Sequence, residues 1–457
     1  MTTAHDYAHQ NQERFQQQLI DLCRIPSVST DPERKGETLQ AAEWVAADMR
    51  KIGLNNVQIM PTPLHPVVYG EWLGAGPNAK TVLVYGHYDV QPAVTSDGWD
   101  QDPFEPTVKD GILYCRGSSD DKGQMFAQLK AFEAMLANGK PTVNVKFLIE
   151  GEEEIGSPNL GKFVAAHRDL LMADVCVISD GSVIALDRPS IGYSTRGLMY
   201  LELEVFGAKQ DLHSGAFGGI VHNPAQALAE IIAQLHNPDG SVAVPGFYDN
   251  VVALSAAERE ELAKSAWTDA EWKEATGVPA FWGEKEYLLH ERIGARPTLE
   301  INGFVSGFYG AGSKTVLPGK ALAKISCRLV ANQNADQIFG LVRDHILRLA
   351  PPTVRVEVRQ LASAGPALMD LNSPYMAAAS RAYEKGWGQK PVYERGGGTL
   401  PILADFQREL NQIPIMLMGF GLQTDGAHGP NEHFVLEMFK RGIDTAICFF
   451  DEVGQIK

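Results

Sequence analysis

The chain has 457 residues, more than one hydrophobic core usually serves, so two domains are expected. Its formal net charge of −16 argues against nucleic acid as a partner, because phosphate binding needs a basic surface. No stretch approaches the ~18 uninterrupted apolar residues of a membrane-spanning helix, and the polar N-terminus lacks the apolar core of a signal peptide. No membrane role is therefore expected.

The cysteines favour a reducing environment. They are odd in number, far apart and mostly inside apolar strand or helix patterns: Cys23, Cys115, Cys176, Cys327 and Cys448. Such cysteines are typical of reduced core residues rather than of a disulfide framework. We therefore expect a cytoplasmic protein.

In the first part of the chain, helical patterns alternate with strand-like runs. Apolar residues recur at spacings of three and four at 5–24 and 38–52, which predicts two amphipathic helices. The predicted strands that follow are 57–60, 67–72, 81–85, 143–149 and 175–179, with helices at 124–136 and 160–171. This alternation predicts a mostly parallel sheet flanked by helices, an α/β fold.

The pattern changes after residue 194. Residues 199–206 and 321–330 alternate apolar with polar residues, as half-exposed strands do. Predicted helices at 224–235 and 335–349, with another strand at 354–360, complete an α+β module with an open-faced sheet.

From about residue 367 the α/β pattern returns. Helices are predicted at 375–385 and 434–450, and a strand at 414–419. The α+β module is therefore predicted to be inserted into the α/β domain, as insertions into surface turns commonly are. The predicted boundaries are 1–194 and 367–457 for the α/β domain and 195–366 for the insertion.

Acids and histidines stand where predicted strands end or glycine-rich turns begin, which is where open α/β sheets present ligand-binding groups. They are His87, Asp89, Asp120, Glu153, Glu154, Asp180 and His428. Each alone has a structural explanation, as a buried histidine, a helix cap or a solvated acidic face. Together, nitrogen and oxygen donors without cysteine suit Zn²⁺, Mn²⁺ or Co²⁺ rather than an iron–sulfur cluster or a structural zinc ion.

The sequence around these residues indicates which of them could bind metal and which could orient a ligand. Metal-bound imidazole usually has its second nitrogen fixed by a carboxylate, so His87 is expected as a ligand and Asp89 as the group that orients it. Asp120 lies in a tight loop before a predicted helix, where its two oxygens could serve two different ions.

Charge balance separates the two neighbouring glutamates. Three ligating carboxylates, Asp120, Glu154 and Asp180, with one bridging hydroxide balance two divalent ions. Glu153 is then left over as the base that takes a proton from water and delivers it to a leaving amine.

Five motifs occur in the order and rough spacing of a known family: G-H-Y-D-V-Q-P, G-S-S-D-D-K-G, E-G-E-E-E-I-G-S, D-L-H-S-G and D-G-A-H-G-P-N-E. Over essentially its whole length the chain resembles the co-catalytic metallopeptidases. These include carnosine dipeptidases, cytosolic nonspecific dipeptidase, peptidase-V-type bacterial dipeptidases, acetylornithine deacetylase and succinyl-diaminopimelate desuccinylase.

The resemblance implies a set of site residues. One metal ion would be held by His87, Asp120 and Asp180, and the other by Asp120, Glu154 and His428. Glu153 would be the general base and acid, and Asp89 would support His87. The insertion would be a lid that dimerises, with His213 of D-L-H-S-G reaching the partner's active site to stabilise the oxyanion. By sequence alone, His213 is a histidine in a glycine-rich turn.

Four residues of the predicted lid and of a late loop resemble positions that bind the substrate's C-terminal end. Arg328 would grip the carboxylate, a task suited to a planar guanidinium, although alone it reads as an exposed arginine. Thr315, Gly398 and Thr399 would line the same end. Thr399 stands where dipeptidases of this pattern often carry serine, and Gly396 where they often carry an acid, so the substrate's identity stays open.

We therefore expect a dinuclear metallohydrolase that cleaves a peptide bond next to a free C-terminal carboxylate in dipeptides or short peptides. A metal-bridging hydroxide would attack while Glu153 moves the proton. Two divalent ions per subunit (Zn²⁺ or Mn²⁺, with Co²⁺ possible), a small peptide substrate and a homodimer through the lid complete the expectation. The long stretch at 238–300 resembles the dipeptidase branch more than compact deacylase lids.

Two alternatives remain open at this point. An N-acyl amino acid deacylase, acting on acetyl or succinyl groups, would use the same site. A non-catalytic metal or peptide-binding protein is of a different class, but Glu153 would serve no purpose in simple binding.

Overall fold

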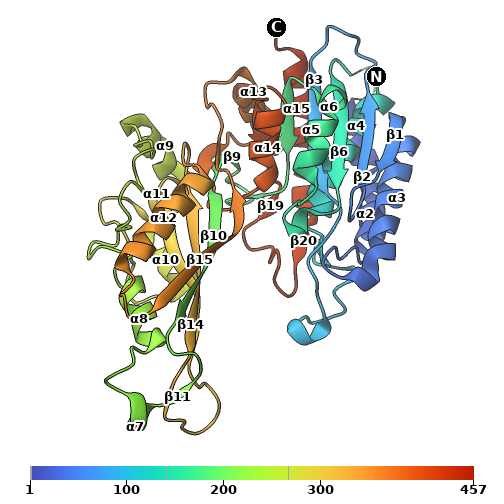
Figure 1. Cartoon of the computed structure of the whole chain (residues 1–457). Helices are drawn as coiled ribbons and strands as arrows, with labels where there is room; N and C mark the ends of the chain where they lie inside the picture. Colours follow the sequence, from blue (N-terminus) through green and yellow to red (C-terminus); the bar gives the residue numbers. More distant parts are fainter. Residues whose placement is uncertain (1–2, 140, 266) are drawn as a thin grey trace. The chain divides into compact units, whose positions relative to one another are not determined.

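The computed structural model describes residues 3–139, 141–265 and 267–457. The chain forms two compact units (Figure 1). Unit 1 consists of Met1–Tyr193, Met369–Glu394 and Asp405–Lys457, and unit 2 of Ser194–Leu368 and Arg395–Ala404. Arg395–Ala404 thus belongs with unit 2, whereas the sequence pattern assigns everything from residue 367 onwards to the first domain. The role of unit 2 as a lid stays a prediction.

The central sheet, most of which lies in unit 1, runs in the order β1-β2-β6-β3-β7-β18-β9-β16, and β17 (Val392–Arg395) also pairs with β9. Its strands are β1 (Asn55–Met60), β2 (Val67–Trp72), β6 (Asn144–Glu150), β3 (Thr81–His87), β7 (Val175–Ile178), β18 (Ile415–Leu417), β9 (Ser190–Thr195) and β16 (Ala367–Leu368). The four strands β6, β3, β7 and β18 are parallel, while β1, β2 and β9 pair antiparallel with their neighbours. The sheet is therefore mixed, with a parallel centre.

Both faces of this sheet are covered, which explains its nearly continuous apolar strands. On one face Phe147 of β6 meets Phe132 of α4 (Lys122–Ala137), with ring centroids 6.1 Å apart. On the other, Tyr85 of β3 meets Phe406 of α14 (Pro401–Glu409) at 5.5 Å. The α/β fold class predicted from the sequence is confirmed.

The other helices of unit 1 include several that the periodicity predicts. They are α1 (Ala4–Gln10), α2 (Gln12–Cys23), α3 (Lys35–Lys51), α5 (Leu160–Ala166), α6 (Arg168–Leu171), α13 (Pro374–Ala382) and α15 (Leu436–Gly454). The single helix predicted for 5–24 is wrong, because Asn11 interrupts it and lies between α1 and α2 with φ −104°.

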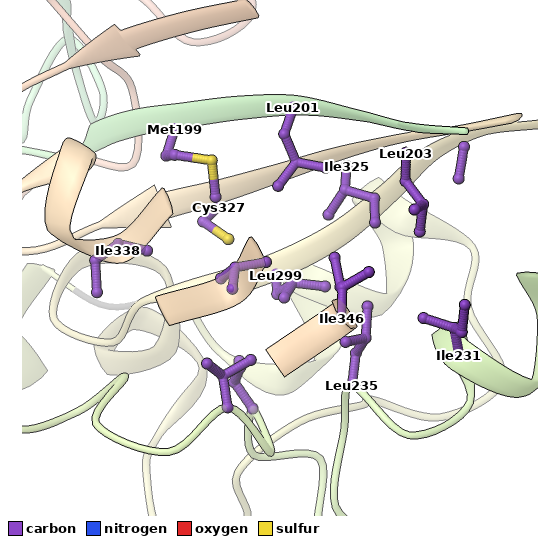
Figure 2. Close-up of a cluster of buried hydrophobic side chains, with 14 of the residues drawn as sticks. Met199, Leu201, Leu203, Ile231, Leu235, Leu299, Ile325, Cys327, Ile338 and Ile346 are labelled. Atoms are coloured by element: carbon purple, nitrogen blue, oxygen red, sulfur yellow. The ribbon is translucent and has the colours of Figure 1, made fainter. Parts of the chain in front are cut away.

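Unit 2 is built on an antiparallel sheet in the order β12-β14-β10-β15. Its strands are β12 (Thr298–Ser306), β14 (Lys320–Leu329), β10 (Gly197–Phe206) and β15 (Arg355–Ala364). The alternation seen in the sequence buries one face of this sheet. There Met199, Leu201 and Leu203 of β10 contribute to one core with α8 (Pro224–Ile232) and α12 (Ala335–Leu349), whose Ile231 and Ile346 appear in Figure 2.

Shorter elements complete the two units. In unit 1 they are β4 (Thr107–Lys109), β5 (Ile112–Tyr114), β8 (Ser182–Val183), β19 (Gly421–Leu422) and β20 (His433–Val435). In unit 2 they are β11 (Leu212–His213), α7 (Ser214–Phe217), α9 (Ala256–Ser265), α10 (Asp269–Thr276), α11 (Leu289–Gly294), β13 (Val316–Leu317) and β16 (Ala367–Leu368). β17 (Val392–Arg395) follows η4 (Tyr383–Trp387).

The sequence predicts neither a membrane-spanning helix nor a disulfide framework. Among the described residues, no helix has both the length and the apolar character needed to cross a bilayer. All five cysteines are buried and free of disulfides, as the sequence predicts. The compartment stays a prediction.

Candidate metal centre

The candidate ligands of unit 1 come from the carboxyl ends of neighbouring strands. His87 is the last residue of β3, and Asp180 follows β7. Glu153 and Glu154 begin η3 (Glu153–Ile155), just after β6. Because β6, β3 and β7 run parallel side by side, their carboxyl ends meet at one edge of the sheet.

Two loops bring the remaining ligands to this edge. Asp120 lies in the glycine- and serine-rich loop that leads into α4. His428 lies in the loop between β19 and β20, with φ +62°, a left-handed conformation uncommon for residues other than glycine.

The side chains converge in two groups that share Asp120. In the first, His87 Nε2 lies 3.2 Å from Asp120 Oδ1 and 3.9 Å from Asp180 Oδ2. In the second, His428 Nε2 lies 3.1 Å from both Asp120 Oδ2 and Glu154 Oε2. Each oxygen of Asp120 therefore faces a different group, and these are the two sets that the resemblance implies. That they bind metal stays a prediction.

The donor chemistry and the charge of this cluster fit divalent cations. The donors are imidazole nitrogens and carboxylate oxygens, which Zn²⁺, Mn²⁺ and Co²⁺ accept. Burial raises the pKa of the Asp180 carboxyl to about 7, and the charge of Asp120 adds to the rise. Burial likewise raises the pKa of Glu153 to about 9, with Asp180 and Glu154 adding to it. Several carboxylates cannot all stay ionised in one buried place unless positive charge, such as that of divalent cations, lies beside them.

Asp89 contacts both sides of the cluster. The ring nitrogen His87 Nδ1 lies 3.0 Å from the Asp89 backbone oxygen and 3.4 Å from Asp89 Oδ1. The Asp89 carboxylate also accepts the backbone N–H groups of Glu153 (3.3 Å) and Glu154 (3.1 Å). One buried carboxylate therefore orients a ligand and the start of η3 together.

The structure distinguishes the two glutamates. Glu154 is held in place, because its carboxylate accepts hydrogen bonds from Gln91 N (3.1 Å) and Gln91 Nε2 (2.8 Å) and faces His428. The Glu153 carboxylate forms no hydrogen bond or ion pair with any described residue. The role of Glu153 as the base stays a prediction.

Sequence reasoning missed two residues that hold the ligands. Gln91 lies in the motif with His87, and Glu432 in the motif with His428. Glu432 is fully buried and accepts the backbone N–H groups of Gly117, Ser119 and Asp120 as well as Arg116 Nη1. The only sequence signal was their presence in glycine-rich motifs, since nothing local links residue 432 to residue 120.

The residues predicted to bind substrate lie in unit 2. Arg328, on β14, donates from Nη1 to Thr399 Oγ1 at 2.6 Å, so these two predicted residues are brought together. The Gly398 carbonyl accepts the backbone N–H of Arg196 at 2.8 Å. His213 and Thr315 are exposed and lie on neighbouring segments, where the Ser214 N–H donates to the Thr315 carbonyl. Their roles stay predictions.

The model of peptidase family M20/M25/M40 matches residues 83–452. The chain belongs to this family. It is 32% identical over 461 residues to the Cys-Gly metallodipeptidase dug1 of Schizosaccharomyces pombe, covering 97% of this chain and 96% of that protein. It is 34% identical over 472 residues to human Beta-Ala-His dipeptidase, covering 98% and 92%.

Solved structures agree with this membership. The M20 family metallo-carboxypeptidase Sso-CP2 from Sulfolobus solfataricus matches with a TM-score of 0.87 and 32% identity, covering 97% of this chain and 99% of that one. The family resemblance and the enzymatic character predicted from the sequence are therefore confirmed. The non-catalytic alternative is set aside.

Proposed function

We propose that this metallopeptidase uses two divalent cations to cleave the peptide bond next to the free C-terminal carboxylate of dipeptides. The relatives confirm the predicted activity, metal-dependent hydrolysis of dipeptides: they include a Cys-Gly metallodipeptidase and a Beta-Ala-His dipeptidase. The observation that carries the two-cation proposal is Asp120, whose two oxygens face two separate groups of ligands beside the unbonded Glu153.

Two sets of side chains would hold the cations. His87, Asp120 and Asp180 would hold one, and Asp120, Glu154 and His428 the other. When bound, such ions polarise the scissile carbonyl and lower the pKa of a bound water toward neutrality. Zn²⁺, Mn²⁺ and Co²⁺ all suit these donors.

The chain's own groups would then manage the proton and the orientation. Glu153 takes the proton from the attacking water and delivers it to the leaving amide nitrogen, because its carboxylate is near the candidate ligands and no described residue forms a hydrogen bond or ion pair with it. Asp89 keeps His87 and the start of η3 in place through its contacts with both.

Unit 2 would supply the groups that recognise the substrate. Arg328 would bind the C-terminal carboxylate, with Thr399 holding its guanidinium. Thr315 and Gly398 would line the same end of the substrate. His213 of a partner subunit would donate to the oxyanion as the carbonyl is attacked.

The homodimer through unit 2 is supported by a sheet edge with which no described strand pairs. β12 is the end strand of its sheet, and Ile301, Phe304 and Val305 on it are exposed apolar side chains. An edge of this kind offers backbone hydrogen bonds and apolar surface to a second copy. A cytoplasmic location is proposed from the five thiols that form no disulfide.

A second candidate is removal of the C-terminal residue from longer peptides. It is favoured by the similarity to Sso-CP2, which is described as a metallo-carboxypeptidase. The same site would serve both activities. They differ in how many substrate residues may stand on the N-terminal side of the scissile bond.

A substrate series on enzyme reconstituted with Mn²⁺ or Zn²⁺ tests the proposal. Cys-Gly and β-Ala-His should be hydrolysed faster than a tripeptide, a dipeptide amide or an N-acetyl amino acid. Faster cleavage of tripeptides would favour the carboxypeptidase. Turnover of N-acetyl amino acids alone would favour the deacylase and refute the proposal.

A further inference from the structure

One loop of unit 2, residues Gly397–Thr399, is held by two guanidinium groups. Arg328 donates from Nη1 to Thr399 Oγ1 at 2.6 Å. Arg196 holds the loop from the other side, with its Nε donating to the Gly397 carbonyl at 2.9 Å and its backbone N–H to the Gly398 carbonyl at 2.8 Å. Three consecutive loop residues are therefore each bonded to an arginine.

The packing is close at Gly397, the first residue of this loop, whereas a Cβ at Gly398 would meet no atom within 4 Å. A side chain at Gly397 would place its Cβ 2.8 Å from Ile293 Cγ2 and 3.5 Å from Arg196 Nη2. Arg328 lies opposite Leu198 in the β10–β14 pair, two residues along the chain from Arg196. The two arginines thus come from the same part of the sheet.

Neither guanidinium forms an ion pair with a described residue. Other arginines of unit 2 form close ion pairs, such as Arg296 with Glu284 and Arg395 with Glu258, both at 2.6 Å. Among the described residues, no carboxylate lies within ion-pair distance of Arg196 or Arg328. Burial lowers the pKa of Arg196 to about 10, and the charge of Arg328 adds to the drop. Glu300 partly offsets this drop without forming an ion pair. Two like charges kept close together with so little compensation favour an anion between or beside them.

We infer that Arg196 is a positioning residue of the substrate-carboxylate site: it fixes the Gly397–Thr399 loop, and through Thr399 it fixes the Arg328 guanidinium that binds the carboxylate. This inference rests on the proposed function, since it takes the anion to be the free C-terminal carboxylate of a peptide. It assigns to Arg196 part of the selectivity for a free carboxylate over an uncharged end.

The test compares one dipeptide with its C-terminal carboxamide in the metal-loaded enzyme. Arg196→Gln should raise KM for the free dipeptide about tenfold to hundredfold, because Arg328 would then lose its charge-assisted contact with the carboxylate, and should change kcat less than about threefold. For the carboxamide, measured as substrate or competitive inhibitor, Arg196→Gln should change affinity less than about twofold. An unchanged KM, or an equal loss for both compounds, would overturn the inference.

Arg292 offers a matched control. It also lies in unit 2 and also donates to backbone carbonyls, those of Tyr287 and Trp282, but these hydrogen bonds do not involve the Gly397–Thr399 loop. Arg292→Gln should leave both affinities within about twofold of the original enzyme. If Arg292→Gln lost as much carboxylate selectivity as Arg196→Gln does, the effect would not be specific to Arg196, and the inference would be overturned.

A double variant tests the route through the loop. Thr399→Val removes the hydroxyl that accepts from Arg328. If Arg196 acts through this contact, the double variant should have a KM within about twofold of Arg196→Gln alone, because coupled residues are not additive. Losses that multiply would refute the route.

Two further results keep the outcome clear. Should Arg196→Gln fail to fold, Arg196→Lys can replace it, because lysine keeps the charge and the aliphatic stem but lacks the planar guanidinium. This variant should still raise KM for the free dipeptide at least about threefold. Unchanged KM would overturn the inference. Absence of any dipeptide hydrolysis in the unaltered enzyme would instead refute the proposed function.

Discussion

The Glu432 carboxylate accepts the backbone N–H of Asp120 at 3.1 Å, across 312 positions of sequence. The same carboxylate accepts from Ser119 and Gly117 at 3.0 Å and from Arg116 Nη1 at 2.6 Å. A buried acid near the C-terminus therefore shapes the loop that presents the shared ligand. Ser119 is also held by Gln124, which donates to its carbonyl, and by Asp425, which accepts from its hydroxyl.

Replacing Glu432 by Gln should lower both stability and metal affinity. The amide would leave Arg116 without its buried counter-charge and would turn a donor toward one of the backbone N–H groups, so a loss of about 3 kcal/mol in unfolding free energy is expected. Thermal unfolding and titration calorimetry with Mn²⁺ measure the two effects. Glu437→Gln, which removes an exposed partner of Arg441, is the control and should cost less than about 0.5 kcal/mol. Equal behaviour of the two variants would contradict the role given to Glu432.

The two neighbouring glutamates should fail in different ways. Glu153→Gln should bind metal as the unaltered chain does but lower kcat by about 10²- to 10⁴-fold, because only proton transfer is removed. Glu154→Gln should lose bound metal, because it removes a carboxylate from the group that contains His428. Metal content by elemental analysis, together with kcat, separates the two. If Glu153→Gln loses metal and Glu154→Gln keeps it, the assignment is reversed.

The attachment of α1 to α15 should depend on pH. His5 Nδ1 lies 2.7 Å from Asp444 Oδ1, and this hydrogen bond, with a further one to Cys448, raises the pKa of His5 to about 10. A raised folded-state pKa stabilises the fold fully below the unfolded value of about 6.5, and this stabilisation is lost as pH rises toward 10. Since the His5 side chain is 36% exposed, solvent screening limits the effect to about 1 kcal/mol.

Melting temperatures of His5→Gln and the unaltered chain, taken from pH 6 to pH 10, test this dependence. The unaltered chain should melt higher at pH 6, and the difference should shrink as pH rises. Asp444→Asn removes the same partner and should show the same trend. A difference that stays constant over this range would show that folding does not raise the pKa of His5.

Mixing two inactive variants tests whether the active site is shared between subunits. Glu153→Ala and His213→Ala should each be nearly inactive as homodimers. After co-refolding, half of the dimers are mixed, and each mixed dimer has one cleft that keeps Glu153 and borrows an intact His213. About a quarter of the original activity should therefore return. No recovery, with mixed dimers shown to form, would mean that His213 acts within its own chain or not at all.

Much of the fold and of the site follows from local patterns. Alternating helices and strands predict the α/β unit, and the alternation in 199–206 and 321–330 predicts the half-buried strands β10 and β14. Parallel strands end at one edge, so acids and histidines placed just after them, such as His87 and Asp180, had to come close together. The sequence by itself therefore determined the types of the candidate ligands and their meeting place, because both depend on the order of residues and on strand direction.

Tertiary structure alone decided which groups from distant parts of the chain contact one another. No local rule places Glu432 against the Asp120 loop, Arg196 against Gly397, or Arg395–Ala404 in unit 2. The antiparallel pairing of β2 with β6 and the break at Asn11 are further examples. These features arise from contacts between segments far apart in the chain, where buried donors and acceptors must find partners in the packed fold, and only the folded chain specifies those partners.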